Sequence, residues 1–323
     1  MIQTIFPAFA KHARAQLADG IVLLPPESTV EADDIREKLD RLNRVARSEG
    51  WRAALQRIWD DDSEAGHDAG DARIDFLESL PLAPDQAVLE IGASLGQVAI
   101  PLARRVRTFD GLAFATGQAT FCLERARQEG LNNVRLTAGG ADCFLPYADD
   151  SFNGVVLNRV LEWCVDPAGE NHEAMQRRLL GEIRRVLRPG GFLYLSTRNR
   201  FALRLILGGR DEYMHGMRWG SALPRPIAWL LAKSRPRGKL HSYRHLARML
   251  RDAGFGRIDG YWAIAETQGP AELIPLDGPE LGERRRSGKI AQGSPQKRRL
   301  AMALLPDRLV KFFTPELTFI AYR

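Results

Sequence analysis

The hydrophobic and polar positions of this 323-residue chain follow two alternating patterns from residue 84 onward. Short apolar runs, typical of buried strands, are separated by longer segments in which apolar residues recur at helical spacing. The runs predict a strand ending at Glu90 and further strands at residues 108–114, 134–136, 154–158, 192–196 and 317–322. Because helices separate the first five strands, we expect parallel strands with crossover connections, a doubly wound α/β sheet.

The helices between these strands have recognisable ends. Residues 118–128 predict one helix, and a longer helix carries five apolar residues on one face: Met175, Leu179, Leu180, Ile183 and Leu187. The sequence Arg-Pro-Gly-Gly at 188–191 predicts its end, because proline and glycine interrupt helical hydrogen bonding.

Residues 1–84 precede the alternating pattern and predict a helical extension. Apolar residues recur at helical spacing in two groups: Ile35, Leu39, Leu42 and Val45, then Trp51, Leu55, Ile58 and Trp59. Residues 60–71 are acidic and contain glycine. They lack the ligand spacing of a calcium loop, so we interpret them as a solvated linker.

The stretch with the clearest chemical meaning is 88–97. Here an apolar run ends in Glu90 and passes through Gly92 and Gly96 into an apolar helix. Such a turn forms a crevice at the carboxyl end of a parallel strand, where open α/β sheets bind ligands. The spacing Glu-x-Gly-x-x-x-Gly differs from the Gly-x-Gly-x-x-Gly motif that binds a dinucleotide pyrophosphate.

This turn resembles the first motif of class I S-adenosylmethionine-dependent methyltransferases, D/E-x-G-x-G-x-G, with Ser94 in place of the middle glycine. Other stretches resemble the family in the same order: G-L-N-N-V at 130–134, L-P-Y and D-D-S-F-N within 145–153, N-R-V-L-E-W at 158–163, L-R-P-G-G at 187–191 and A-G-F at 253–255. The resemblance is to the small-molecule, ubiquinone and menaquinone type. It implies a Rossmann-like sheet of seven strands with the last strand antiparallel.

The resemblance also implies a domain organisation. Residues 85–323 are expected to form the methyltransferase-like domain, with insertions at about 198–240 and 266–313. Part of the extension at 1–84 is expected to act as a lid over the cofactor, because many small-molecule members of the family use that segment so.

S-adenosylmethionine is the cofactor that the resemblance implies, and its parts map onto named positions. The methionine part is assigned to the glycine turn: Glu90, Gly92, Ala93, Ser94 and Gly96. Ala113 stands at the tip of the second strand, where the family has a carboxylate for the ribose diol. The loss of that hydrogen bond should weaken cofactor binding by roughly 1.5–3 kcal/mol. Three further positions complete the assigned set: Phe114 for the sugar or adenine face, Asp142 for the adenine amine and Asn158 after the fourth strand. A surface-loop role for Asp142 is an equal alternative.

Two functions therefore fit the sequence. One is an active methyltransferase, which positions and dehydrates an acceptor and needs no strong base. The other is a catalytically silent relative that keeps the sheet and acts as a binding or partner subunit. Ala113, Ser94 and the displaced Asp142 favour the silent relative. Glu90, both outer glycines and Asn158 favour the enzyme, which is our prediction.

Candidates for the acceptor site lie in the insertion at 198–240, where the family commonly builds its substrate pocket. They are Tyr213, His215 and Trp219. His215 is also a weak candidate for taking a proton from the acceptor at neutral pH. Packing or a solvated loop is the simpler interpretation of each residue.

Charge is distributed unevenly along the chain. Residues 196–251 contain thirteen lysines and arginines and only two acidic residues, and a second basic stretch follows at 284–299. Basic segments beside tryptophan and leucine suit a small anionic acceptor, a lipid- or carrier-linked one, or peripheral contact with an anionic membrane through 225–239. An RNA acceptor is the weaker alternative, because no RNA-binding module is recognisable.

Composition indicates the class of protein and its redox environment. The chain is 45% hydrophobic and 27% charged, as expected for a globular protein with a core. Its three scattered cysteines predict free thiols and a reducing, cytoplasmic location. His241 and His245 are four residues apart without the acid of a metal motif, so they predict a solvated helix face and no metal site. A protein partner or a homodimer is also compatible with the sequence.

Overall fold

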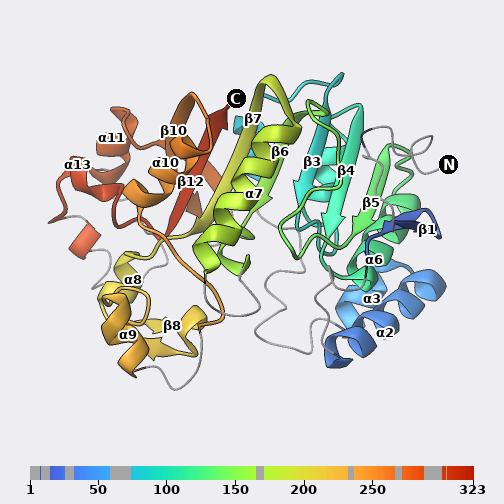
Figure 1. The fold of residues 1–323 in the computed structure, drawn as a ribbon, viewed down its shortest axis with the longest axis horizontal. Helices are drawn as coiled ribbons and strands as arrows, with labels where there is room; N and C mark the ends of the chain where they lie inside the picture. Colours follow the sequence, from blue (N-terminus) through green and yellow to red (C-terminus); the bar gives the residue numbers. More distant parts are fainter. Residues whose placement is uncertain are drawn as a thin grey trace. The chain divides into compact units, whose positions relative to one another are not determined.

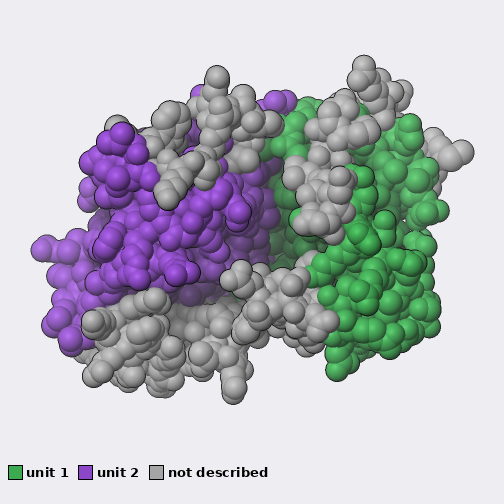
Figure 2. Space-filling view, turned by 90° about the horizontal axis from the view of Figure 1, so that it is seen from below, with its two compact units in different colours: residues 1–77, 81–156, 185–191 green, residues 78–80, 157–184, 192–323 purple. Residues whose placement is uncertain are grey.

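The computed structural model describes residues 8, 15–25, 33–58, 74–164, 171–231, 236–265, 271–286, 300–302 and 304–323 (Figure 1). The chain forms two compact units. The first contains residues 1–77, 81–156 and 185–191, and the second contains residues 78–80, 157–184 and 192–323 (Figure 2). The expected boundary at residue 84 is thus not where the units divide. The predicted linker at 60–71 and Trp59 lie outside the described residues.

The strands of the main sheet follow the order β1-β2-β5-β4-β3-β6-β7-β12-β10-β11. Pairing is parallel from β2 through β5 and β4 to β3, and antiparallel from β7 through β12 and β10 to β11. The predicted α/β sheet is confirmed, with the last strand, β12, antiparallel. In the order of the sheet the bounds are β1 (Gln16–Ala18), β2 (Ile21–Leu23), β5 (Val134–Ala138), β4 (Thr108–Ala113), β3 (Ala87–Ile91), β6 (Phe152–Asn158), β7 (Leu187–Arg198), β12 (Glu316–Tyr322), β10 (Arg257–Ala265) and β11 (Ala271–Pro275).

Three edge strands lie outside the predicted seven: β1, β2 and β11. The first two form a hairpin in the segment predicted to be helical. Asp19 (φ +51°) and Gly20 (φ +83°) make its two-residue turn, a sequence that strongly favours hairpins. Ile21 and Val22 are buried where β2 pairs with β5. Residues 16–23 therefore form strands, not the predicted helix, because their apolar side chains are buried at the edge of the sheet.

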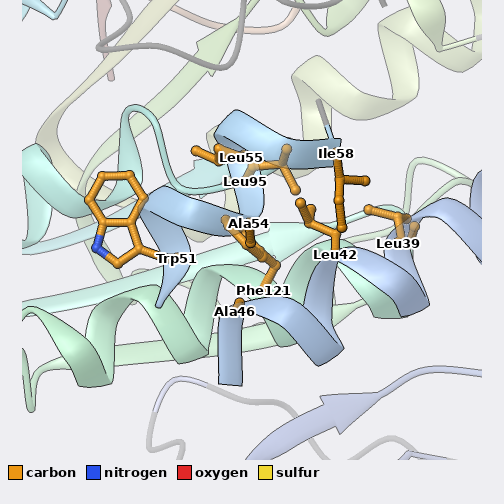
Figure 3. Close-up of a cluster of buried hydrophobic side chains, with 10 residues drawn as sticks. Leu39, Leu42, Ala46, Trp51, Ala54, Leu55, Ile58, Leu95 and Phe121 are labelled. Atoms are coloured by element: carbon orange, nitrogen blue, oxygen red, sulfur yellow. The ribbon is translucent and has the colours of Figure 1, made fainter. Parts of the chain in front are cut away.

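The predicted N-terminal helices are α2 (Asp33–Glu49) and α3 (Trp51–Ile58), which pack on α6 (Thr116–Gln128). Asn43 Nδ2 donates a hydrogen bond to the carbonyl of Gly117 at 2.9 Å, and Gln128 Nε2 donates to that of Ala46 at 2.7 Å. The buried residues form one cluster that includes Leu95 of the glycine turn (Figure 3): Leu39, Leu42, Ala46, Trp51, Ala54, Leu55, Ile58, Leu95, Ala115 and Phe121. The extension thus packs directly on the turn.

The second unit has its own core. Its long helix is α7 (His172–Val186), and α10 (Tyr243–Asp252) begins at Ser242, whose Oγ accepts a hydrogen bond from the backbone N–H of His245. The segments from β10 through α11 (Glu280–Arg286) to α13 (Asp307–Val310) supply one buried cluster: Trp262, Ile274, Leu276, Leu281, Met302 and Val310. Most of the basic stretch at 284–299 lies outside the described residues.

The insertion at about 198–240 folds into short elements. They are α8 (Leu203–Ile206), β8 (Arg210–Asp211), the 3-10 turn η4 (Glu212–Met214), β9 (Met217–Arg218) and α9 (Arg225–Leu231). The carboxylate of Asp211 is buried and accepts hydrogen bonds from the backbone N–H groups of Tyr213 at 3.0 Å and Ser221 at 2.6 Å. Across the described residues, every helix is too short or too polar to cross a membrane.

Candidate cofactor and acceptor sites

The glycine turn joins β3 to α5 (Ala99–Ala103) and is left-handed at Gly92 (φ +87°) and Gly96 (φ +84°). A Cβ atom added at Gly96 would also lie 3.2 Å from Sγ of Cys122 on α6. Backbone conformation and close packing therefore both require glycine at the end of the motif.

The backbone N–H groups of this turn are bonded within the first unit. Those of Gly92 and Ala93 donate to the carbonyl of Leu112 on β4 at 2.8 and 3.0 Å, and that of Ser94 donates to the carbonyl of Gly92 at 2.7 Å. A phosphate-binding loop directs such groups at its ligand. This turn is therefore not arranged to bind a pyrophosphate.

Glu90 lies on β3, two residues before Gly92, and is only 4% exposed. Among the described residues, its Oε2 has no hydrogen-bond partner. Burial raises the pKa of this carboxyl group to about 8, because the charged form loses its solvation. An unpartnered buried oxygen costs free energy, so a ligand donor would be favourable here.

Ala113 ends β4 and is fully buried, and its carbonyl accepts a hydrogen bond from the N–H of Gly139 at 2.8 Å. Asp110, earlier on the same strand, is 3.2 Å from the guanidinium group of Arg135. Burial, partly offset by the charge of Arg135, raises the pKa of Asp110 to about 6. Asp110 thus belongs to a separate buried pair and does not replace the carboxylate missing at Ala113.

The other predicted cofactor residues of the first unit differ in environment. Phe114 is half-buried. Ser94 Oγ accepts a hydrogen bond from Nε2 of Gln118 at 3.4 Å, so α6 brings a polar side chain, not singled out from the sequence, to the turn. Asp142 is exposed, and its Oδ1 accepts a hydrogen bond from the N–H of Phe144 at 3.2 Å. This Asx turn agrees with the surface-loop interpretation.

Asn158 ends β6 in the second unit and is half-buried. The next residue, Arg159, has φ +58°, an uncommon conformation for a non-glycine residue. Its guanidinium group donates to Oε1 of Glu316 at 2.7 Å, and NH1 of Arg198 lies 3.2 Å from the same oxygen. Two partly exposed arginines therefore share one carboxylate at the ends of β6 and β7.

Glu162 follows β6 in a short 3-10 turn and is 1% exposed. Its Oε2 accepts a hydrogen bond from Oγ1 of Thr197 at 2.6 Å, and its Oε1 is bonded to the hydroxyl of Tyr213 at 3.2 Å. Burial is the main cause that raises the pKa of Glu162. The sequence indicated an acid after the fourth strand, but its partners come from distant residues and could not be read from the local pattern.

The three predicted acceptor residues separate into one buried and two exposed side chains. Tyr213 is 4% exposed, and its ring lies 4.9 Å from that of Trp163, which is half-exposed. His215 is exposed on a left-handed residue (φ +52°) that ends η4. Trp219 is 47% exposed. The insertion therefore supplies Tyr213 to a buried network and leaves the other two side chains on the surface.

Comparison with known families identifies the fold. Residues 89–195 match the family model described as a methyltransferase domain. The matched segment is about a third of the chain and is similar to a methyltransferase domain. The matched residues run from β3 to β7 and include the glycine turn, Ala113 and Glu162.

Three relatives are similar to parts of this chain. The ubiquinone biosynthesis O-methyltransferase of Paracidovorax citrulli is 27% identical over 50% of this chain and 65% of its own length. The malonyl-[acyl-carrier protein] O-methyltransferase of Methylococcus capsulatus is 30% identical over 41% of this chain and 46% of its own length. The demethylmenaquinone methyltransferase of Symbiobacterium thermophilum is 26% identical over 70% and 84%. This chain thus covers less than two thirds of the first two relatives.

The residues of the first unit fit the methionine part of S-adenosylmethionine better than the ribose. Glu90 offers a buried oxygen without a described partner, two residues before the left-handed Gly92. The position of the ribose carboxylate is occupied by Ala113, which has no polar side chain. A functioning site would need another group for the diol.

One further cluster, in the second unit, has the residue types of a metal site. Possible ligand atoms of Glu173, His241 and His245 lie within 4.8 Å of one another. However, Lys239 Nζ is 2.6 Å from Oε2 of Glu173, and Arg177 Nε is 3.1 Å from Oε1. Both carboxylate oxygens therefore already face cations, which would repel a metal ion.

The electrostatics support an ion-pair interpretation of this cluster. Burial alone would raise the pKa of Glu173, but the hydrogen bond and charge of Lys239, with help from Arg177, lower it to about 2. His241 is 4% exposed and its Nε2 lies 2.6 Å from the side-chain oxygen of Gln176. The expectation that His241 lies on a solvated helix face was therefore wrong: it precedes α10 and is held by α7.

Proposed function

We propose that this chain transfers a methyl group from S-adenosylmethionine to a small acceptor with a negative charge, either free or linked to a lipid or an acyl carrier. The observation that carries the proposal is the buried carboxyl group of Glu90 beside a turn that requires Gly92 and Gly96. That combination, inside a matched methyltransferase domain, supports a site for a cationic small molecule.

S-adenosylmethionine supplies the electrophilic methyl group, and the work of the chain is to position and dehydrate the reactants. Glu90 would accept hydrogen bonds at the methionine end. Gln118 and Phe114 would stand in for the missing carboxylate at the ribose, since Gln118 already reaches the turn through Ser94. His215 is the candidate for taking a proton from the acceptor, because it is an exposed imidazole.

An anionic acceptor is supported by charge in the second unit. Arg159 and Arg198 share the carboxylate of Glu316, and an acceptor carboxylate or phosphate could join or replace that carboxylate. The similarity to an enzyme named for malonyl-[acyl-carrier protein] and to enzymes named for ubiquinone and menaquinone agrees with carrier- and lipid-linked acceptors. A lipid-linked acceptor would bring the chain into peripheral contact with a membrane.

The competing function is a silent relative, which Ala113 and Ser94 favour. Calorimetric titration of the full chain with S-adenosylmethionine and S-adenosylhomocysteine separates the two. We expect saturable binding of both, followed by methyl transfer to an anionic acceptor in a screen with radiolabelled cofactor. The absence of heat at millimolar ligand, with a folded protein, would replace the enzyme by the silent subunit.

A further inference from the structure

Exposed apolar side chains concentrate in the insertion of the second unit. Of the eleven large hydrophobic residues that are exposed among those described, six lie between residues 206 and 231: Ile206, Leu207, Trp219, Ile227, Leu230 and Leu231. Scattered exposed residues are normal, but a concentration in one short segment is typical of an interaction surface.

Helix α9 exposes three large apolar residues. Ala228 is buried, whereas Ile227, Leu230 and Leu231 are 47%, 86% and 57% exposed. These three residues have the i, i+3, i+4 spacing of one helix face. A helix that only covered the core would direct its leucines inward. The face formed by Ile227, Leu230 and Leu231 can therefore contact an apolar partner.

Trp219 is fixed in an exposed position. Its Nε1 donates to the carbonyl of Ile206 at 3.0 Å, and its ring covers Gly208, where an added Cβ would lie 3.0 Å from the ring. The residue also keeps a left-handed backbone (φ +60°), which is strained for a side chain of this size. The fold thus holds an amphipathic indole beside the exposed Leu207.

Three arginines surround the same turn. Arg210 and Arg218 are exposed and lie directly opposite each other in the β8–β9 pair, where like charges repel. Arg204 donates to the carbonyl of Arg210 at 2.7 Å. In the part of the chain that the structure describes, no carboxylate lies within salt-bridge distance of these three guanidinium groups. An external anionic partner would relieve their mutual repulsion.

We propose that these six apolar residues, with Arg204, Arg210 and Arg218, form a docking surface for an anionic lipid bilayer. Leucine, isoleucine and tryptophan would enter the interface between headgroups and acyl chains, while the arginines contact lipid phosphates. Exposed aliphatic side chains in the same segment as arginines without a described carboxylate partner suit a bilayer better than RNA, which needs aromatic platforms for its bases. The proposal moves the predicted contact at 225–239 toward residues 204–231. Lys233 and Arg235 lie outside the described residues.

This surface deepens the proposed action on a lipid-linked acceptor, and it can be tested without cofactor. The full chain is floated with vesicles of phosphatidylcholine alone and of phosphatidylcholine mixed with phosphatidylglycerol. We expect binding only to the anionic vesicles. Leu230→Glu should reduce it at least tenfold, and Arg210→Glu with Arg218→Glu should reduce it by more than the roughly fivefold expected for each basic residue.

Matched controls come from elsewhere in the second unit. Leu304 is 75% exposed and Arg308 is exposed, and neither belongs to the docking surface. Leu304→Glu and Arg308→Glu should leave vesicle binding within twofold of wild type. Brominated lipid should quench less of the total fluorescence in Trp219→Phe than in wild type. Equal loss in the controls, or unchanged quenching, would overturn the proposal.

Two other outcomes also decide. In one, wild type does not bind vesicles and Leu230→Glu converts a dimer into a monomer. The surface would then bind a second copy of the chain, and the proposal would be wrong. Calorimetry with S-adenosylmethionine on the same variants distinguishes the two ideas. Vesicle binding without cofactor binding would contradict the methyltransferase function and support the docking surface. Cofactor binding without vesicle binding would support the methyltransferase function and contradict the docking surface.

Discussion

Two buried glutamates, one in each unit, both lie at or just after the end of a strand but differ in their hydrogen bonding. Glu90 on β3 and Glu162 after β6 are both almost fully buried, and burial raises the pKa of both. Glu162 is bonded through both oxygens, to Thr197 and Tyr213, whereas Oε2 of Glu90 has no partner among the described residues. The contrast separates a carboxyl group whose hydrogen bonds are made within its own unit from one that leaves an oxygen where a ligand donor would be favourable.

The largest expected effect is on stability at Glu162. Glu162→Ala leaves the buried hydroxyl groups of Thr197 and Tyr213 without their acceptor, and each unsatisfied group costs roughly 1–3 kcal/mol. We expect a loss of about 3 kcal/mol or more in the free energy of unfolding, measured by urea denaturation. Glu90→Ala is the matched control and should cost less, because no described donor loses its partner. Equal losses would remove the distinction between the two glutamates.

The next effect is on cofactor binding. Here we expect the larger loss at Glu90 and the smaller one at Glu162. Glu90→Gln keeps the volume but removes the group that can ionise when a cationic ligand binds, and a charge-assisted hydrogen bond is worth roughly 1.5–3 kcal/mol in a dry site. We therefore expect affinity for S-adenosylmethionine to fall at least tenfold in calorimetry. Glu162→Gln should change the affinity by less than twofold. A larger effect at Glu162 than at Glu90 would mean that the ligand does not use the glycine turn.

The dependence of stability on pH sharpens the comparison further. The pKa of Glu90 is about 8 in the folded chain and near 4.5 when unfolded, so the folded state holds a proton that the unfolded state releases between these values. Its contribution to stability is complete below pH 4.5 and is lost as pH rises to 8, at up to about 1.4 kcal/mol per pH unit. Asp110, with a pKa of about 6, acts in the same direction over a narrower window.

Chemical denaturation of wild type and Glu90→Gln across pH 5 to 9 measures this term. The variant cannot ionise at position 90, so its stability should fall less steeply between pH 5 and 8. Asp110→Asn provides the control, because it should remove only the part of the slope near pH 6. Parallel curves for wild type and Glu90→Gln would show that Glu90 is solvated in the folded protein.

The sequence predicts the local parts of both sites and misses the parts that depend on distant pairing. The glycine spacing and the alanine at 113 follow from neighbouring residues. The expected strand ends differ from those observed: β5 runs to Ala138, where it pairs with Ala113, and β7 begins at Leu187, which was expected on the preceding helix. Glu162 is different, because its partners lie 35 and 51 residues away. Likewise, the β1–β2 hairpin is fixed by pairing with β5, more than a hundred residues further along, although its Asp-Gly turn was a readable signal. Burial of His241 depends on Gln176 of α7 in the same way.

The smallest effect concerns Ala113, where the carboxylate expected for the ribose diol is missing. Ala113→Asp restores the carboxylate that the family uses for the ribose. A charge-assisted hydrogen bond to the diol should tighten binding of S-adenosylmethionine by about tenfold, or 1.4 kcal/mol. Because residue 113 is fully buried, the same change should lower stability without ligand, since the new carboxylate is desolvated.

Ala113→Asn separates charge from shape, because it brings a similar side chain without the charge and should gain less affinity. If both variants stay folded and neither changes the affinity, the tip of β4 does not face the ribose. The methionine end at Glu90 would then be the whole of the recognisable cofactor site. If Ala113→Asp tightens binding while Glu90→Gln weakens it, both ends of one ligand are located by opposite effects at two buried positions.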